Sequence, residues 1–252
     1  MFEISAKTDI GPSASQNDDR ILVENRIYTN TSFYDEIYGS FINIAVCDGV
    51  GGLSLGNVAA ETALSTISEI NADEVNEENI IEKIFTANDE INQKRAQYQM
   101  NGGLRTTLVG VVTDETKTFV YHIGDSRAYI FNRPYLTQVT EDHSLVNDLV
   151  KRGELTENDA FHDSRKNIIT RSLGVEKLVR PSIDDITEDF LEGSIIMLCS
   201  DGISDVMEKK ELKDIFNDDS LSLEEMKDKI FDSALKKGSD DNISLILVRK
   251  VN

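Results

Sequence analysis

The chain has 252 residues, of which 46 are acidic and 26 are basic, so its formal net charge at pH 7 is −20. Such a length is enough to bury a sizeable core without disulfides or a structural metal. The negative charge argues against a protein that coats nucleic acid or binds an anionic membrane through charge. Hydrophobic residues make up 39% of the chain and Pro only 3 residues, which excludes a disordered or collagen-like protein.

Short apolar runs rich in β-branched residues predict strands. In chain order, these runs cover residues 41–47, 107–113, 118–123, 195–199 and 243–248. Apolar stripes at helical spacing predict helices over residues 58–70, 80–98, 145–152 and 223–235. Because the strands cluster in runs and the helices come in pairs, the pattern favours an α+β fold over strict alternation of strand and helix.

The sequence shows no sign of a boundary between domains. No Pro-, Ser- or Gly-rich linker and no repeat of fixed period interrupts the sequence, so we expect residues 1–252 to form a single domain. Residues 141–174 differ from the rest because they are polar and rich in mixed charge. We expect them to be an insertion carried on the surface of the domain.

The two cysteines and the start of the chain bear on location. Cys47 and Cys199 are too few for a disulfide framework, which suits a reducing compartment. No apolar stretch reaches the roughly 18 residues of a membrane span, and the first residues lack a basic region followed by an apolar one. We therefore expect a cytoplasmic protein.

Several apolar strands end in aspartate. Asp48 and Asp201 are each followed by glycine, and Asp125 follows a third apolar run. A carboxylate at the end of an apolar strand is costly to desolvate unless a positive charge meets it. One Asp-Gly pair after a strand is most often a turn, but three such strand ends together indicate a cation site.

Further oxygen donors lie near these strand ends. Asp18 and Asp19 form one pair, and Asp241 and Asn242 directly precede the last apolar run. The absence of a side chain at Gly49 lets the main chain approach an ion, so its carbonyl is a candidate neutral ligand. All these groups are hard oxygen donors and no His/Cys spacing fits zinc, so the implied metal is Mg²⁺ or Mn²⁺.

Two other binding motifs fail on detail. The glycine-rich residues 48–52 are not followed by the lysine of a P-loop, and Ser54 occupies the place of the third glycine of a dinucleotide fingerprint. Residues 71–82 have Val75 and Asn76 where an EF-hand needs a ligand and a turn glycine.

With these residues the chain resembles the metal-dependent protein phosphatase 2C family, in particular its bacterial serine/threonine members. The resemblance rests on six motifs in family order: Gln16-Asn17-Asp18-Asp19, Asp48-Gly49-Val50-Gly51-Gly52, Thr106-Thr107, Ile123-Gly124-Asp125-Ser126-Arg127-Ala128-Tyr129, Ser200-Asp201-Gly202-Ile203-Ser204-Asp205 and Asp241-Asn242-Ile243-Ser244. Each motif alone is weak, but six in the right order span nearly the whole chain. The resemblance implies a β-sandwich of two antiparallel sheets flanked by helix pairs, with a flap at about residues 141–174.

The resemblance also implies a metal centre at one edge of the sandwich. Asp48 would bridge two tightly bound Mn²⁺ or Mg²⁺ ions, Gly49 would supply its carbonyl, and Asp201 and Asp241 would complete the ligands. Asp125 matches the aspartate that helps to hold a third, weaker ion in bacterial members. The ions would activate a bridging water and stabilise the phosphoryl oxygens during in-line attack, so no covalent enzyme intermediate is needed.

Around the ligands, the resemblance gives roles to neighbouring residues. Asp18 and Asp19 stand where the family has a Glu-Asp pair that orders metal-bound water, and a bridging water can absorb the missing methylene of Asp18. Asn242 is expected beside the ligand Asp241. Val50 occupies the position of a histidine found in eukaryotic members, as is usual in bacterial ones.

One departure from the family concerns the phosphate. Many members carry an arginine that grips the substrate phosphate where this chain has Ala14. Because a bidentate arginine contact is among the stronger polar contacts, its loss should weaken substrate binding. Arg127 and Arg165 are candidate replacements, as is Arg20.

Histidine supplies a candidate proton donor. The stretch His162-Asp163-Ser164-Arg165 resembles the His-Pro-x-Arg of the bacterial flap. His162 could protonate the leaving alkoxide near neutral pH, or simply pack within the flap. His122 and His143 are expected to be structural or exposed.

The expected function is hydrolysis of phosphoserine and phosphothreonine in proteins, opposing a serine/threonine kinase. Phosphorylated proteins are then the expected partners, and nucleic acids and membranes are not. Two alternatives stay open. One is a catalytically weak regulatory domain that binds phosphoproteins, motivated by Ala14, and the other is a phosphomonoesterase that acts on small molecules.

Overall fold

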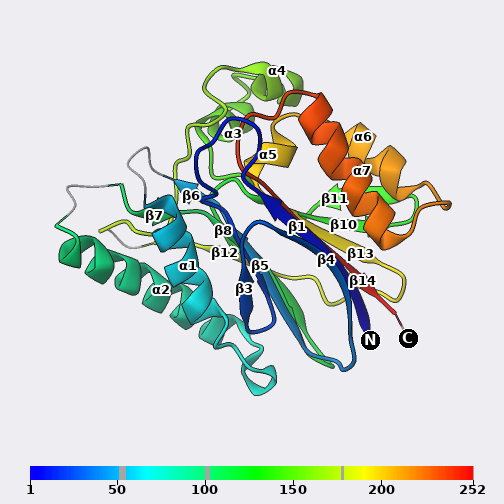
Figure 1. The fold of residues 1–252 in the computed structure, drawn as a ribbon, viewed down its shortest axis with the longest axis horizontal. Helices are drawn as coiled ribbons and strands as arrows, with labels where there is room; N and C mark the ends of the chain where they lie inside the picture. The colour runs from blue at the N-terminus through cyan, green and yellow to red at the C-terminus, as the bar shows by residue number, and fades with distance from the viewer. Residues whose placement is uncertain (51–54, 100–102, 177–178, 252) are drawn as a thin grey trace.

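The computed structural model describes residues 1–50, 55–99, 103–176 and 179–251. Gly51 and Gly52 of the glycine-rich motif, and Ser54 after it, lie outside the described residues. The described residues form two six-stranded antiparallel sheets packed face to face, with helices on both outer faces (Figure 1). The expected α+β sandwich with flanking helix pairs is therefore confirmed. That the whole chain is one domain stays a prediction.

The first sheet joins the two ends of the chain. Its strand order is β11 (Tyr135–Gln138), β10 (Arg127–Asn132), β13 (Ile195–Cys199), β14 (Ile243–Lys250), β1 (Phe2–Asp9) and β4 (Thr31–Ile37). β1 pairs with β14 along its full length, from Phe2 opposite Lys250 to Asp9 opposite Ile243. The termini consequently lie close together (Figure 1).

The second sheet carries the strands that begin the proposed metal site. Its order is β12 (Ser182–Asp185), β9 (Thr118–Ile123), β8 (Leu108–Thr113), β5 (Ile42–Cys47), β2 (Arg20–Val23) and β3 (Arg26–Tyr28). A two-stranded ribbon of β6 (Gly49–Val50) and β7 (Arg105–Thr106) follows β5.

β5 is almost entirely apolar because its two faces contribute to two different cores. Ile44 and Val46 lie in the core between the two sheets. Ala45 and Cys47 point the other way, into the core under α1 (Gly56–Ile67) and α2 (Glu77–Gln97). Since side chains alternate between the faces of a strand, a strand covered on both faces is mostly apolar. The one polar side chain of β5, Asn43, is buried and donates from Nδ2 to Ile67 O (2.8 Å).

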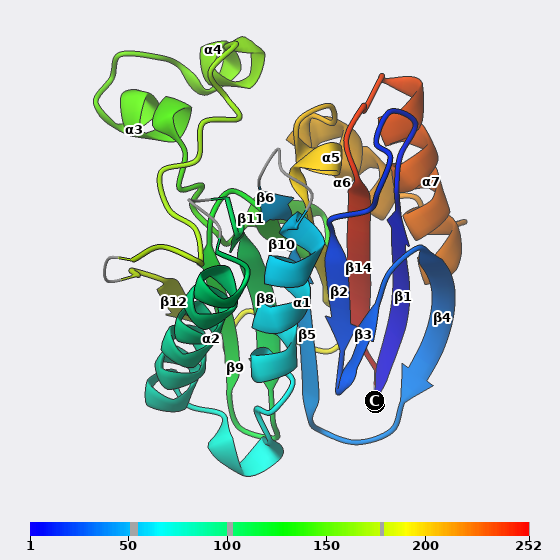
Figure 2. The ribbon, with the colours of Figure 1, turned by 60° about the vertical axis from the view of Figure 1, so that its left-hand side comes forward.

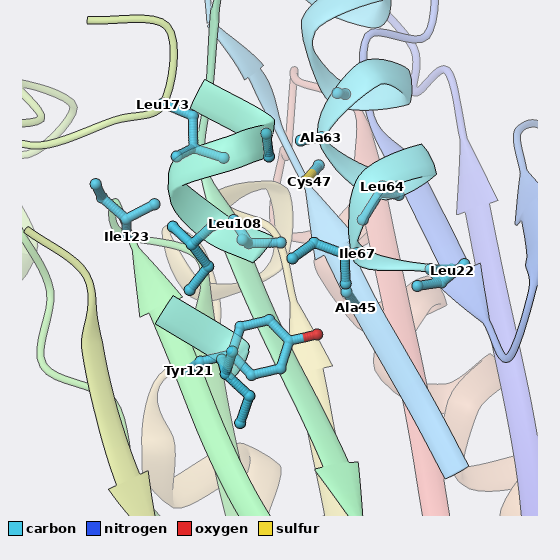
Figure 3. Packing of buried hydrophobic residues seen from close by; sticks show 14 of the residues in the cluster. Leu22, Ala45, Cys47, Ala63, Leu64, Ile67, Leu108, Tyr121, Ile123 and Leu173 are labelled. Atoms are coloured by element: carbon cyan, nitrogen blue, oxygen red, sulfur yellow. The ribbon is translucent and has the colours of Figure 1, made fainter. Parts of the chain in front are cut away.

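Helix pairs close the two outer faces. Figure 3 shows Leu64 and Ile67 among the buried side chains under α1, in the same cluster as Leu108 and Tyr121 of the second sheet. A short 3-10 helix, η1 (Ala72–Glu74), lies between α1 and α2. The first sheet is covered by α5 (Asp201–Ser204), α6 (Lys209–Phe216) and α7 (Leu223–Lys236). No helix in the described ranges is long and apolar enough to span a membrane.

The polar insertion stands apart from these layers. Its helices α3 (Leu145–Lys151) and α4 (Glu157–His162) extend beyond the end of the sheets (Figure 2). At its root the chain leaves and returns side by side, because Leu145 N–H donates to Ile168 O (2.8 Å) and Thr170 N–H donates to His143 O (2.7 Å). We call residues 141–174 the flap.

Candidate metal centre

The predicted ligands converge because antiparallel pairing brings strand ends to one edge. β13 ends beside the start of β14, with Cys199 opposite Leu245, which places Asp201 near Asp241. The pairing of Arg20 with Cys47 likewise brings Asp18 and Asp48 to the same edge. A pocket of about 570 Å³ opens there, and its described lining residues are Ala14, Ser15, Gln16, Asp18, Asp48, Gly49, Val50, Asp125, Asn167, Ile169, Asp201, Asp241 and Asn242.

Three hydrogen bonds hold the backbone of Asp48, whose side chain lines this pocket. Its N–H donates to Thr107 Oγ1 (3.0 Å). Its carbonyl accepts from Thr107 N–H (2.9 Å) and from Thr106 Oγ1 (2.8 Å). The Thr106-Thr107 motif therefore fixes the main chain at the end of β5 and leaves the carboxylate of Asp48 available to the pocket.

Gly49 packs against the first residue of α1. A Cβ on Gly49 would lie 2.3 Å from the carbonyl carbon of Gly56, and a Cβ on Gly56 would lie 2.5 Å from Gly49 O. Both residues must be glycine for this approach. Asp18 Oδ1 accepts from Asn57 N–H (3.1 Å) at the same helix start, where a carboxylate is favoured by the helix dipole.

Asp19 and Asn242 hold the surrounding loops. Asp19 is buried outside the pocket lining, and its Oδ2 accepts from Ser200 Oγ (2.8 Å). Asn242 Oδ1 accepts from Asp18 N–H (2.7 Å), and its Nδ2 donates to Ile10 O (2.8 Å). Asn242 therefore ties the start of β14 to the segment that carries Asp18.

The aspartates make the pocket strongly negative. Burial, followed by the charge of neighbouring aspartates, raises the pKa of Asp48 and of Asp201 well above the ordinary range. Burial is also the main cause that raises the pKa of Asp125 and of Asp19 to about 7. The buried Oδ1 of Asp201 has no hydrogen-bond partner among the described residues. An ionised carboxylate in that situation needs a positive charge beside it.

The donor set fits a divalent cation. Asp48, Gly49, Asp125, Asp201 and Asp241 all line the pocket and offer only hard oxygen atoms. In the described ranges, no three Asp, Glu, His or Cys side chains are gathered tightly enough to define an ion position by themselves. The fit to Mg²⁺ or Mn²⁺ therefore rests on the shared pocket, the oxygen chemistry and the unpartnered Asp201 oxygen.

Comparison with known proteins decides the family. The model of the family Protein phosphatase 2C matches residues 13–243. The chain belongs to the protein phosphatase 2C family. It is 32% identical over 219 residues to the serine/threonine phosphatase stp of Listeria monocytogenes serotype 4b, covering 82% of this chain and 84% of that protein. The expected family and the expected activity class, a serine/threonine protein phosphatase, are thus confirmed.

Solved structures support the same conclusion. The serine/threonine phosphatase Stp1 from Staphylococcus aureus superimposes with a TM-score of 0.86 at 27% identity, covering 100% of this chain and 96% of that chain. The catalytic domain of the serine/threonine protein phosphatase PstP, solved with 2 manganese ions, matches with a TM-score of 0.79 at 22% identity, covering 100% of both chains. At that identity the second likeness shows the fold alone.

In this protein phosphatase 2C chain, neither Arg127 nor Arg165 is among the described lining residues of the pocket. Arg127 donates from Nε and Nη2 to the carboxylate of Asp142, with a shortest distance of 2.6 Å. Arg165 is exposed and makes a similar paired contact with Asp163, at 2.9 and 2.7 Å. The substrate-binding roles of Arg127 and Arg165 therefore stay predictions, and both guanidinium groups have carboxylate partners elsewhere.

Arg20, the third candidate for binding the substrate phosphate, is held by the backbone, whereas Ala14 lies in the pocket wall. Arg20 is buried, and its Nη1 donates to the carbonyls of Asn17 and Asp19, each at 2.8 Å. Ala14 does line the pocket. Among the described lining residues none is Lys or Arg, so the family position of the phosphate-gripping arginine has no basic replacement there.

The flap contributes residues that the sequence did not reveal. Asn167 and Ile169 line the pocket, although the sequence motif drew attention to positions 162–165. His162 is exposed at the end of α4, where its Nδ1 lies 2.9 Å from Asn158 O, and it is not among the described lining residues. Its role as proton donor stays a prediction. In the sequence, the only indication of a role for Asn167 was its position two residues after Arg165 of the motif.

Proposed function

We propose that this protein phosphatase removes phosphate from phosphoserine and phosphothreonine of proteins by direct attack of water and thereby opposes a serine/threonine kinase. The observation that carries the proposal is the pocket that Asp48, Asp201 and Asp241 line together, with a buried Asp201 oxygen that lacks a described protein partner. Bound Mn²⁺ or Mg²⁺ would supply the charge that lowers the pKa of a water and stabilises the phosphoryl oxygens.

The proposal assigns a separate task to each aspartate. Asp48 and the Gly49 carbonyl, with Asp201 and Asp241, would hold two tightly bound ions. Asp125 follows the turn at the end of β9 and would hold a third, weaker one. Support comes from the strand pairing that carries these residues to one edge and from the backbone hydrogen bonds that fix Asp48.

The proposal also separates Asp18 from Asp19. Asp18 lines the pocket and is held at the start of α1, so it would orient the attacking water. Asp19 is buried against Ser200, the residue before Asp201, so it would hold that ligand in place. Asn242 would act through Asp18, whose N–H it accepts.

The proton for the leaving alkoxide is proposed to come from His162. Because this side chain lies at the exposed end of α4, the flap would have to bring it nearer to the pocket when a phosphoprotein binds. We further propose a cytoplasmic location, supported by two buried cysteines without disulfides. The physiological ion is proposed to be Mn²⁺ or Mg²⁺ on the chemistry of the donors.

The test is hydrolysis of a phosphothreonine peptide with Mn²⁺, with Mg²⁺ and with EDTA. We expect metal-dependent turnover that Asp48→Asn abolishes and that the matched change Asp232→Asn, on the exposed side of α7, leaves unchanged. Turnover of sugar phosphates or nucleotides in preference to the peptide would instead identify a small-molecule phosphomonoesterase. No turnover by a folded, metal-loaded protein would contradict the proposal and favour a phosphoprotein-binding regulator.

A further inference from the structure

His143 connects four parts of the molecule. Its N–H donates to Gly124 O (2.9 Å), and its Nδ1 accepts from Gly124 N–H (3.1 Å). Its carbonyl accepts from Thr170 N–H (2.7 Å) on the returning strand of the flap. Its Nε2 lies 3.2 Å from Ser182 Oγ in β12, and its ring stacks on that of His122 at a centroid distance of 4.7 Å. His143 therefore contacts the β9–β10 turn, the flap root, β12 and β9.

The Gly124 hydrogen bond requires a neutral imidazole. Because Nδ1 accepts a hydrogen bond from Gly124 N–H, the proton of the neutral ring is on Nε2, which lies 3.2 Å from Ser182 Oγ. Burial, then the charges of His122 and Arg171, lowers the pKa of His143 to about 3. The guanidinium of Arg171, whose Nη1 lies 3.1 Å from Nε2, places a positive charge beside the ring and so disfavours the doubly protonated imidazolium. The ring thus remains a hydrogen-bond acceptor at neutral pH.

The Gly124 turn is tightly packed against Thr107. Gly124 has a φ of +112°, and a Cβ there would lie 2.6 Å from Thr107 Cγ2. Thr107 Oγ1 lies 2.7 Å from Ser126 Oγ and also accepts from Asp48 N–H. The turn is therefore enclosed between Thr107, which holds Asp48, and His143, which holds the flap root. Asp125 lies within this turn and lines the pocket.

We propose that His143 is a positioning residue that fixes the turn containing Asp125 to the root of the flap. Through this link, Asp125 and the flap residues Asn167 and Ile169 face the same pocket. The inference deepens the proposed function and rests on it for its effect on catalysis. The link itself, between Gly124 and the imidazole, stands on geometry alone.

Amide hydrogen exchange on the metal-free protein tests the link without any activity. His143→Leu removes the acceptor, and since a net hydrogen bond is worth a factor of roughly ten, the Gly124 amide should exchange about tenfold faster. His143→Asn keeps an acceptor oxygen near the place of Nδ1 and should restore most of the protection. The cavity variant Leu136→Ala on β11 serves as the control for a general loss of stability.

The exchange experiment has clear opposing outcomes. Protection at Gly124 that is unchanged in His143→Leu, or that is lost equally in Leu136→Ala, would overturn the proposal. Protection that His143→Asn fails to restore would also count against the acceptor role. Selective loss in His143→Leu together with rescue in His143→Asn supports it.

Turnover of a phosphothreonine peptide at increasing Mn²⁺ concentration gives the functional readout. We expect His143→Leu to raise the Mn²⁺ concentration for half-maximal activity about threefold to tenfold, the range that follows from losing one net hydrogen bond. His143→Asn should return it towards the wild-type value. Equal Mn²⁺ dependence in active wild type and His143→Leu would refute the positioning role. If the wild type itself shows no turnover, the proposed function fails while the exchange result still judges the link.

Discussion

The ammonium group of Lys166 donates to the carbonyl oxygen of Asp205 (2.9 Å) and lies 3.2 Å from Asp205 Oδ2. Lys166 belongs to the flap and directly precedes Asn167, which lines the pocket. Asp205 is the C-cap of α5, the helix that begins at Asp201. This contact therefore joins the flap to the segment that carries a proposed metal ligand.

Lys166→Met tests that connection. The side chains of Lys166 and Asp205 are 29% and 24% exposed, so we expect the loss to be about 1 kcal/mol. The flap should be cleaved faster by a protease, and the KM for a phosphopeptide should rise about threefold to fivefold, the factor that corresponds to this energy. The control is Lys151→Met, which removes an exposed flap ion pair with Glu141. Equal effects in both variants would show that the Lys166 contact has no special role.

The extent to which sequence predicted the fold differs between strands. β5, β13 and β14 were identified because both of their faces are covered, so their apolar runs are continuous or nearly continuous. β4 was missed because its residues Thr31–Ile37 are mostly exposed and include Asp35 and Glu36. β1 was missed because Glu3 and Lys7 interrupt its apolar pattern. Exposure on one face, not weak strand formation, hid these elements.

Some residues of the candidate site could be predicted from the sequence and others could not. Asp48, Asp125, Asp201 and Asp241 could be proposed from sequence because each adjoins a strand end or start, and local pattern carries that information. The partner of Arg127 could not, since Asp142 is reached only through the tertiary fold. The pocket position of Asn167 likewise depends on how the flap returns at its root.

Without metal, the folded protein should lose stability as pH rises from about 4 to about 7. The pKa of Asp19 and of Asp125 is raised from 3.8 to about 7 in the folded protein, chiefly by burial. Between these values the folded state binds more protons than the unfolded state, so the stability contributed by the neutral forms is lost as pH rises towards 7. Each group contributes up to about 1.4 kcal/mol per pH unit.

His143 acts in the opposite direction on the EDTA-treated protein. Its pKa is lowered from 6.5 to about 3, so its contribution falls as pH decreases below about 6.5. Burial also lowers the pKa of His122. Because the carboxylates with a raised pKa, among them Asp19, Asp48, Asp125 and Asp201, outnumber these two imidazoles, we expect Tm in EDTA to increase from about pH 8 to about pH 5. Saturating Mn²⁺ should remove this trend, because ions bind the deprotonated ligands. A Tm in EDTA that rises with pH over this interval would contradict the prediction.

Asp201→Asn should separate stability from metal binding. The change removes an ionisable group whose pKa is raised first by burial and then by repulsion from Asp125, Asp205 and Asp241. At about pH 8 the metal-free variant should be as stable as the wild type or more stable, by about 1 kcal/mol or more. Added Mn²⁺ should no longer raise its Tm. Asp232→Asn, an exposed change on α7, should keep the full response to Mn²⁺. A full Mn²⁺ response in Asp201→Asn would remove Asp201 from the ligand set.

The net charge of the chain predicts a preference among substrates. Bound ions would offset the aspartates that line the pocket, but no described lining residue is basic and the net charge of the chain is −20. Phosphopeptides with Arg beside the phosphothreonine should therefore have higher kcat/KM than equal-length peptides with Glu, by about tenfold at low salt, and added salt should reduce the difference. Equal rates at low salt would refute this preference.

Ala14→Arg tests what the missing arginine costs. Ala14 lines the pocket, so an arginine there would start from the wall of the site and could bind the phosphate through two N–H groups. We expect KM for the phosphopeptide to fall roughly 10-fold to 150-fold with little change in metal affinity, because hydrogen bonds to charged groups contribute roughly 1.5 to 3 kcal/mol. Ser13→Arg adds the same charge at an exposed position outside the described pocket lining. If both variants lower KM equally, the gain reflects long-range attraction to the phosphate. A lower KM for Ala14→Arg alone would show that the phosphate passes within reach of this wall of the pocket.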